Sequence, residues 1–117
     1  MKAKEMFEKI GYQEIENFGL FGKSYRRLWT SWYENDNDLI EDVKENGKLR
    51  MLHIDIGEFI DKYIHLTLKD VDAKIENNKI VSRTDGELVG FPPLGFTLSL
   101  EELEAINKQV EELGLKE

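Results

Sequence analysis

The clearest pattern of apolar and polar positions lies near the C-terminal end of the chain, where apolar residues recur at helical spacing. One face of residues 99–114 carries Leu100, Leu103, Ile106, Val110 and Leu113. Ser99 and Glu102 have the spacing of a capping box, and Gly114 can end a helix in the left-handed conformation. We therefore predict an amphipathic helix here, with its apolar stripe packed on the core.

A second helical pattern opens the chain. Residues 2–10 form a helical stripe of Ala3, Met6, Phe7 and Ile10. Gly11 follows as the helix-ending residue, and Tyr12 stands where the apolar contact of a Schellman motif falls. A short strand over 13–18 and a turn over 19–22 are expected next.

Residues 23–33 give the strongest strand signal, because they are rich in aromatic and other strand-favouring residues. Alternation places Leu28, Thr30 and Trp32 on one face, and we expect Leu28 and Trp32 to point into the core. The opposite face of this strand then gathers Tyr25, Arg27, Trp29, Ser31 and Tyr33.

Alternation also marks residues 49–56 and 63–69, which we predict to be two strands around a turn at 57–62. Their alternate apolar residues define the expected core face of the sheet: Leu52, Ile54, Ile56, Ile64, Leu66 and Leu68.

Weaker signals fill the chain between these strands and the last helix. Short strands are expected over 73–75 and 79–81, joined by a turn at Asn77-Asn78. Residues 84–86 read Thr-Asp-Gly, which is typical of a further turn. Adjacent prolines make residues 90–95 an extended, non-helical lead into the last helix.

The polar connection over 34–48 has two interpretations. It can hold a short helix with Asp38 as cap, Glu41 at the capping-box position and Asn46-Gly47 at the end. Asn46-Gly47 can equally be the type I′ turn of a hairpin.

These elements predict an α+β fold in a single domain spanning residues 1–117. About four strands form a small, mostly antiparallel sheet. The N-terminal and C-terminal helices pack on one face of it.

Composition narrows the function classes. The chain of 117 residues has no cysteine, which excludes disulfides, thiolate zinc sites and cysteine nucleophiles. Charged residues interrupt the apolar positions at the N-terminus, and no apolar run approaches the length of a membrane span, so we expect a cytoplasmic protein without a membrane partner. The formal net charge of −8 argues against direct nucleic-acid binding.

Two groups of side chains resemble metal sites in part. Glu34, Asp36, Asp38 and Glu45 echo the ligand spacing of a calcium loop, but Leu39 occupies the position that needs Gly, so a solvated loop or a helix start is favoured. On the two central strands, His53, Asp55 and His65 share one face if the pairing register allows it. Ordinary strand residues are the favoured interpretation there, because no further ligand is evident.

No nucleophile elbow, phosphate loop or dinucleotide fingerprint occurs in the chain. We therefore expect neither an enzyme nor a bound cofactor. The candidate site is instead a sheet face that presents Tyr25, Arg27, Trp29, Tyr33, His53, Tyr63 and His65, beside Met51. Aromatic residues, Met and Arg are enriched at protein interfaces, and the rings could also stack on a base. The alternative is that another element of the protein covers these rings.

The two ends of the chain, residues 4–12 and 99–114, resemble small uncharacterised proteins from phages and prophages of Gram-positive bacteria. The middle of the chain does not carry the resemblance. Those proteins commonly end in Gly-Trp, whereas this chain continues Gly114-Leu-Lys-Glu. The resemblance implies an accessory phage protein that inhibits or redirects a host factor, and it transfers no site residues.

Three functions follow as hypotheses. The first is a non-enzymatic module that binds a host or phage protein, for which a homodimer is one arrangement. The second is a small-ligand binder, of a nucleotide or a metal, that uses the aromatic and histidine face. The third is an acidic mimic that blocks a nucleic-acid-binding protein.

Overall fold

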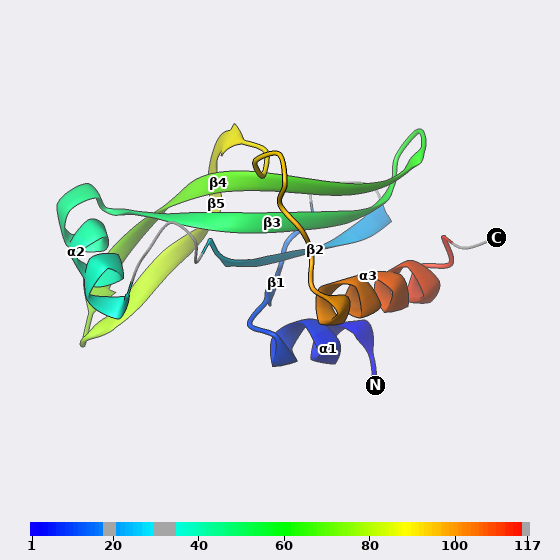
Figure 1. Ribbon diagram of the computed structural model, residues 1–117, viewed down its shortest axis with the longest axis horizontal. Helices are drawn as coiled ribbons and strands as arrows, with labels where there is room; N and C mark the ends of the chain where they lie inside the picture. The colour runs from blue at the N-terminus through cyan, green and yellow to red at the C-terminus, as the bar shows by residue number, and fades with distance from the viewer. Residues whose placement is uncertain (18–20, 30–34, 116–117) are drawn as a thin grey trace.

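The computed structural model, which describes residues 1–17, 21–29 and 35–115, has an antiparallel sheet and three helices in that part of the chain (Figure 1). In chain order these are α1 (Ala3–Lys9), β1 (Gln13–Ile15), β2 (Phe21–Leu28), α2 (Asp36–Asn46), β3 (Lys48–Glu58), β4 (Lys62–Glu76), β5 (Lys79–Gly90) and α3 (Leu100–Glu112). The five strands lie in the order β1-β2-β3-β4-β5. The α+β prediction is confirmed, but the expected four strands and two helices were too few.

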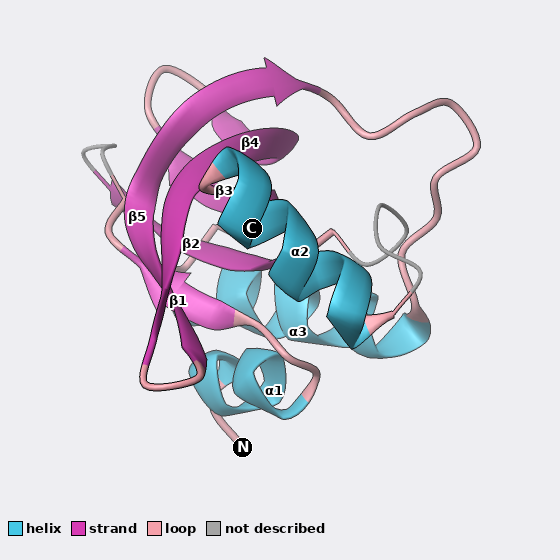
Figure 2. Ribbon diagram, turned by 90° about the vertical axis from the view of Figure 1, so that its left-hand side faces the viewer, coloured by secondary structure: helices cyan, strands magenta, loops and turns pink. Residues whose placement is uncertain are grey.

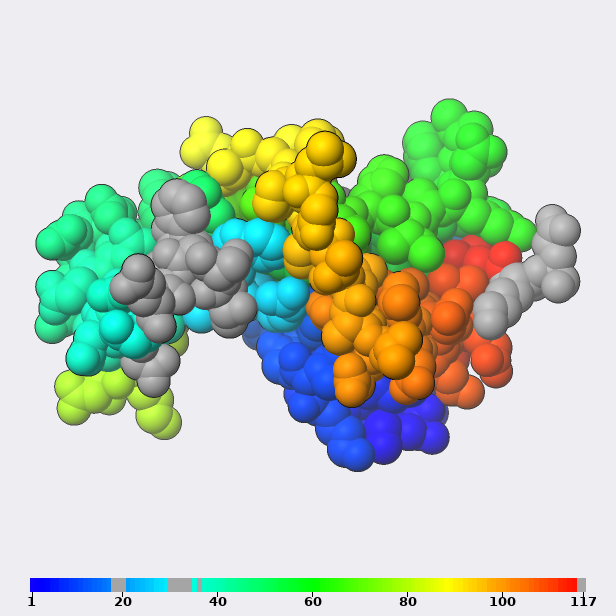
Figure 3. Space-filling view, viewed as in Figure 1, coloured from blue at the N-terminus to red at the C-terminus, as the bar shows by residue number. Residues whose placement is uncertain are grey.

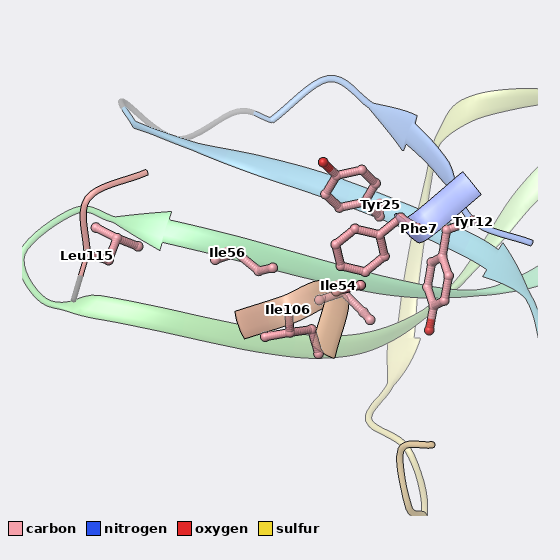
Figure 4. Close-up of a cluster of buried hydrophobic side chains, with 8 residues drawn as sticks. Phe7, Tyr12, Tyr25, Ile54, Ile56, Ile106 and Leu115 are labelled. Atoms are coloured by element: carbon pink, nitrogen blue, oxygen red, sulfur yellow. The ribbon is translucent and has the colours of Figure 1, made fainter. Parts of the chain in front are cut away.

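Helices α1 and α3 pack against the same face of the sheet, here called the helix-covered face. Figure 4 shows the cluster that joins them: Phe7, Tyr12, Tyr25, Ile54, Ile56, Ala105, Ile106 and Leu115. The ring of Phe7 stacks on Tyr25 with 3.9 Å between centroids, and Tyr12 meets Phe7 edge-on at 5.2 Å. Stacked and edge-on pairs add to the stability gained from burying the rings.

The alternation predicted in β3 and β4 is confirmed at most positions of this face. Leu52, Ile54 and Ile56 are fully buried, and Leu68 is buried as well. Leu66 is partly buried against the same cluster, whereas Ile64 is exposed near the β3–β4 turn. The core face therefore ends before that turn.

Helix α2 lies against the opposite face of the sheet. Its Val43 clusters with Leu49, Met51 and Val71, and Leu28 packs against the same group. Leu28 was expected to share its face with the core of the predicted sheet, but alternation across β2 turns it away from Tyr25 and toward α2.

The helical interpretation of residues 36–46 is correct, with a different cap. The side chain of Asn35, not Asp38, is the cap, because its Oδ1 accepts the backbone N–H of Asp38 at 2.9 Å. Gly47 ends the helix with φ 66°.

The ends of α1 and α3 follow their sequence signals. Gly11 has φ 92°, and the N–H groups of Gly11 and Tyr12 donate to the carbonyls of Glu8 and Phe7, which completes a Schellman motif. At α3, both hydrogen bonds of the predicted capping box between Ser99 and Glu102 are present.

Strands β4 and β5 are longer than predicted. Asn77 and Asn78 form the expected turn, with φ of 50° and 62°. The turn expected at 84–86 is wrong, because β5 continues through it. Gly86 pairs with Val71 near a register shift, and a Cβ atom at Gly86 would lie 2.6 Å from the Val71 Cγ1 atom. The glycine marks a close approach of two strands rather than a turn.

The sheet is strongly curled, so that β5 returns toward β1 and β2. Figure 2 shows β5 and β4 arching around the side of the sheet that carries α2. The guanidinium of Arg26 on β2 bridges the curl, because it donates to the carbonyl of Arg83 at 2.5 Å and to Ser82 Oγ at 3.0 Å on β5. Side chains in the middle of this concave face are therefore enclosed.

Candidate functional site

The structure does not gather the predicted site residues on one exposed face. Tyr25, Arg27 and Trp29 lie on the helix-covered face, because Tyr25 pairs with Ile54 and Arg27 with Leu52. Tyr25 is 1% exposed, and its hydroxyl donates to Gln109 Oε1 at 2.5 Å. Trp29 is buried with Leu52 and packs against Phe96. Other elements of the protein therefore cover the rings of Tyr25 and Trp29, which is the alternative that the sequence left open.

Arg27 belongs to a buried polar network that joins α3 to the sheet. Its Nε lies 3.2 Å from Glu102 Oε2 and 3.1 Å from the Tyr12 hydroxyl, and the guanidinium sits over the Tyr12 ring. The Tyr12 hydroxyl donates to Glu102. Burial alone would raise the pKa of Glu102, but the Ser99 N–H, Tyr12 and Arg27 together lower it. The three side chains satisfy one another, which indicates a structural role.

His53, Tyr63 and His65 lie on the opposite face of the sheet, and Tyr33 lies outside the described residues. Asp55 pairs with His65 and His53 pairs with Thr67, so His53, Asp55 and His65 do share a face. Among residues 1–17, 21–29 and 35–115, no group of three His, Asp or Glu side chains could hold a metal ion.

Two adjacent rows of the concave face form what we call the polar face. They run across β2, β3 and β4 and consist of Ser24, Asp55 and His65 in one row and Arg26, His53 and Thr67 in the other. Ser24 donates to Asp55 Oδ1 at 2.5 Å. The face is enclosed at His53, which is 1% exposed, and opens to solvent at His65. Sequence reasoning missed Arg26 and Thr67, although their alternation with Tyr25 and Leu66 placed them here.

The polar face holds buried groups without hydrogen-bond partners. Among the residues that the structure describes, neither ring nitrogen of His53 has one, and neither does the hydroxyl of Thr67. The pKa of His53 is lowered to about 4, mainly by burial and also by the nearby Lys69 and Arg26, while Asp55 opposes them. His53 is therefore neutral at pH 7, with one donor and one acceptor.

A second feature is an exposed apolar surface, here called the apolar ridge, formed by Phe91, Leu94, Leu100 and Leu103. Their exposed fractions run from 43% to 106%. Figure 3 shows residues 91–103 as a continuous raised band down the front of the molecule, from the end of β5 to α3. Phe96 and Leu98 of the same segment point inward and hold it on the core.

The ridge corrects the prediction that the whole apolar stripe of α3 packs on the core. The buried residues of α3 are Glu102, Ala105, Ile106 and Gln109. The helix is turned so that Glu102 and Gln109 reach Arg27, Tyr12 and Tyr25, which leaves Leu100 and Leu103 in solvent. Residues 91–100 contain more apolar side chains than this segment can bury against the core. That excess was the signal in the sequence for an exposed apolar surface.

None of the helices within the described ranges is long and apolar enough to cross a membrane. Comparison of the chain with models of protein families found no match, and searches among curated proteins and solved structures found no similar protein. Its function must therefore be argued from the polar face and the apolar ridge.

Proposed function

We propose that this chain is a non-enzymatic interaction module that binds a protein partner through the apolar ridge. The observation that carries the proposal is the exposure of four large apolar side chains along residues 91–103. Single exposed apolar residues are normal on protein surfaces, but four large ones within a single 13-residue segment favour an interaction site. Phe96 anchors the segment against Trp29, so the ridge is held in place before a partner arrives.

The charges beside the ridge indicate what kind of partner fits. Glu101 and Glu104 are exposed next to Leu100 and Leu103, and the exposed Glu87 precedes the ridge on β5. The whole chain carries a formal net charge of −8. The favoured partner is therefore a protein segment with apolar side chains flanked by Lys or Arg, because opposite charges guide association and favour the right partner.

The resemblance of both chain ends to small phage and prophage proteins supports a biological setting for this activity. We place the chain as an accessory protein that acts in the cytoplasm on a host or phage protein. The buried Tyr12, Arg27 and Glu102 network supports a non-enzymatic role, because these ionisable groups serve packing rather than a solvent-facing site.

A pull-down with matched variants tests the proposal. The wild-type protein should capture a partner saturably from a Gram-positive host lysate, and the partner, once purified, is titrated against each variant. The double variant Leu100→Ser/Leu103→Ser should bind at least about tenfold more weakly, because burying a leucine side chain is worth about 1.5–3 kcal/mol. Circular dichroism should show an unchanged fold, since both side chains are exposed.

The control variant Phe59→Ser/Ile60→Ser removes a second exposed apolar pair at the β3–β4 turn, where the exposed fractions are 67% and 85%. It should bind the partner like the wild type. Absence of saturable capture, or equal binding by the ridge variant and the wild type, would contradict the proposal. Self-association that the ridge variant abolishes would identify a second copy as the occupant instead.

A further inference from the structure

The polar face contains a buried cation for which the described part of the chain supplies no carboxylate partner. Arg26 is 3% exposed, and its contacts are Gln13 Oε1, Ser82 Oγ and the Arg83 carbonyl, all of them neutral. Asp55, in the next row, accepts from Ser24 instead. A buried charge without an opposite charge is costly, so an anionic ligand that reached Arg26 would relieve that cost.

Several side chains around Arg26 have hydrogen-bonding groups that are available to a ligand. Arg26 has five N–H groups, of which three are used by its contacts. His53 and Thr67 lie beside it in the same row, and their buried polar side-chain atoms have no hydrogen-bond partner within residues 1–17, 21–29 and 35–115. The ammonium-bearing Lys69 follows Thr67 on the same side of β4 and acts electrostatically on His53. Most of these unused groups are hydrogen-bond donors, which suits a ligand with several acceptor oxygens.

Two hollows border hydrogen-bond partners of Arg26 rather than Arg26 itself. Gln13 lines a shallow groove of about 830 Å³ that also includes Thr84, and Ser82 and Arg83 line a smaller hollow of about 330 Å³. At β4 the polar face itself opens at the exposed His65.

We infer that the polar face binds an oxyanion, of the size and charge of phosphate, between Arg26, His53, Thr67 and Lys69. The N–H groups of Arg26, the N–H of neutral His53 and the hydroxyl of Thr67 donate to its oxygens, and Lys69 contributes charge. Charge-assisted hydrogen bonds of this kind are stronger than neutral ones. This site is independent of the apolar ridge, so either proposal can fail alone.

Titration with inorganic phosphate tests the inference on the intact chain. Phosphate should raise the melting temperature saturably beyond sodium chloride of equal ionic strength, because a ligand that binds only the folded state stabilises it. It should also shift the ring ¹⁵N resonances of His53. A nucleoside monophosphate in a parallel titration distinguishes the source: tighter binding than phosphate assigns the oxyanion to a phosphoester, and equal or weaker binding assigns it to the free ion.

Two variants locate the site. Thr67→Val removes a hydroxyl that has no partner in the described part of the chain, so the free protein should keep its stability while phosphate affinity falls about tenfold. Lys69→Gln should weaken phosphate binding without unfolding the protein. Thr97→Val, at an exposed threonine outside the polar face, is the matched control and should behave as wild type.

The inference would be overturned if neither phosphate nor the nucleoside monophosphate had an effect beyond the chloride control. It would also be overturned if Thr67→Val and Lys69→Gln left the phosphate effect unchanged. Arg26 is not used as a variant, because its contacts with β5 also support the curl of the sheet.

Discussion

Individual buried side chains join the helix layer of this protein to its sheet. Glu102 accepts from the Tyr12 hydroxyl and lies 3.2 Å from Arg27 Nε, with side-chain exposures of 10% for Glu102 and 20% for Arg27. A charged pair this well enclosed is costly to break, because the remaining partner stays desolvated. The network therefore fixes how α3 is rotated and, through that rotation, which leucines it exposes.

Replacing one member of the network should reduce stability. Glu102→Gln leaves Arg27 without its carboxylate, and we expect the free energy of unfolding to fall by about 2 kcal/mol in urea titrations at neutral pH. Glu104→Gln, on the exposed side of the same helix, should change it by less than about 0.5 kcal/mol. Similar effects of the two variants would contradict a structural role for the network.

His53 should make the stability of the protein depend on pH. Burial lowers its pKa from 6.5 to about 4, with Lys69, Arg26 and Asp55 as the charged groups around it. Between these values the unfolded chain binds the proton and the folded protein does not, so stability is full above pH 6.5 and is lost as the pH falls toward 4. The loss from His53 alone between about pH 7 and about pH 5 should be about 2 kcal/mol.

Urea unfolding at a series of pH values measures this loss. His53→Gln has no titrating ring, so its stability should fall less over the same range, and the difference between the two pH profiles isolates His53 from the carboxylates. Parallel profiles for the variant and the wild type would show that the folded protein protonates this ring with an ordinary pKa.

At the scale of whole elements, the parts of the fold that could be predicted from sequence are those with local causes. The ends of α1 and α3 depend on residues within one turn, such as Gly11 and the Ser99–Glu102 box, so their spacing alone identified them. Alternation in β3 also identified Leu52, Ile54 and Ile56 as buried. It did not identify Leu49, Met51 and His53, which are buried on the opposite face of the same strand.

The parts that could not be predicted depend on distant partners. The rotation of α3 depends on Arg27 and Tyr25, which are far away in sequence and draw polar residues of the helix inward. Distant elements also cover the rings that alternation alone left free to face either way: α1 and α3 cover Tyr25, and Phe96 covers Trp29. The sequence grouped His53, Asp55 and His65 but missed Arg26 and Thr67. The lack of partners for His53 and Thr67 within the described part of the chain becomes visible only in the enclosed arrangement.

The continuous path of β5 predicts the effect of a small substitution. At Gly86, a Cβ atom would lie 2.6 Å from Val71 Cγ1 and 2.7 Å from the Asp70 carbonyl oxygen. We expect Gly86→Ala to lower the free energy of unfolding by about 2 kcal/mol, because an added methyl group forces the strands apart. The exposed neighbour Glu87→Ala should have less than about 0.5 kcal/mol of effect. Calorimetry that finds Gly86→Ala neutral would indicate a turn rather than a close strand contact.

The whole molecule is elongated, with principal extents of 47, 31 and 26 Å. Helix α2 covers one end, α1 and α3 lie toward the other, and residues 91–99 cross the front between them (Figure 1). The apolar ridge therefore lies on a broad, accessible side of an acidic protein. A basic partner can approach it under long-range attraction.

Salt should weaken binding to such a partner. Glu101→Gln/Glu104→Gln should reduce the affinity and make it less sensitive to salt, because it removes the charges nearest the ridge. Glu41→Gln/Glu45→Gln makes the same change of charge at exposed positions on α2 and should have a smaller effect. Titrations of the purified partner at several salt concentrations compare the two. Equal salt dependence in both variants would argue against charge recognition at the ridge.

Hydrogen exchange of the protein with and without its bound partner reports where on the molecule the partner binds. We expect slower exchange at backbone amides of residues 91–104, with the β3–β4 turn and the turn between β4 and β5 unchanged. Protection confined to the β3–β4 turn, to the free edge of β5 or to the polar face, with no change along residues 91–104, would contradict binding through the apolar ridge.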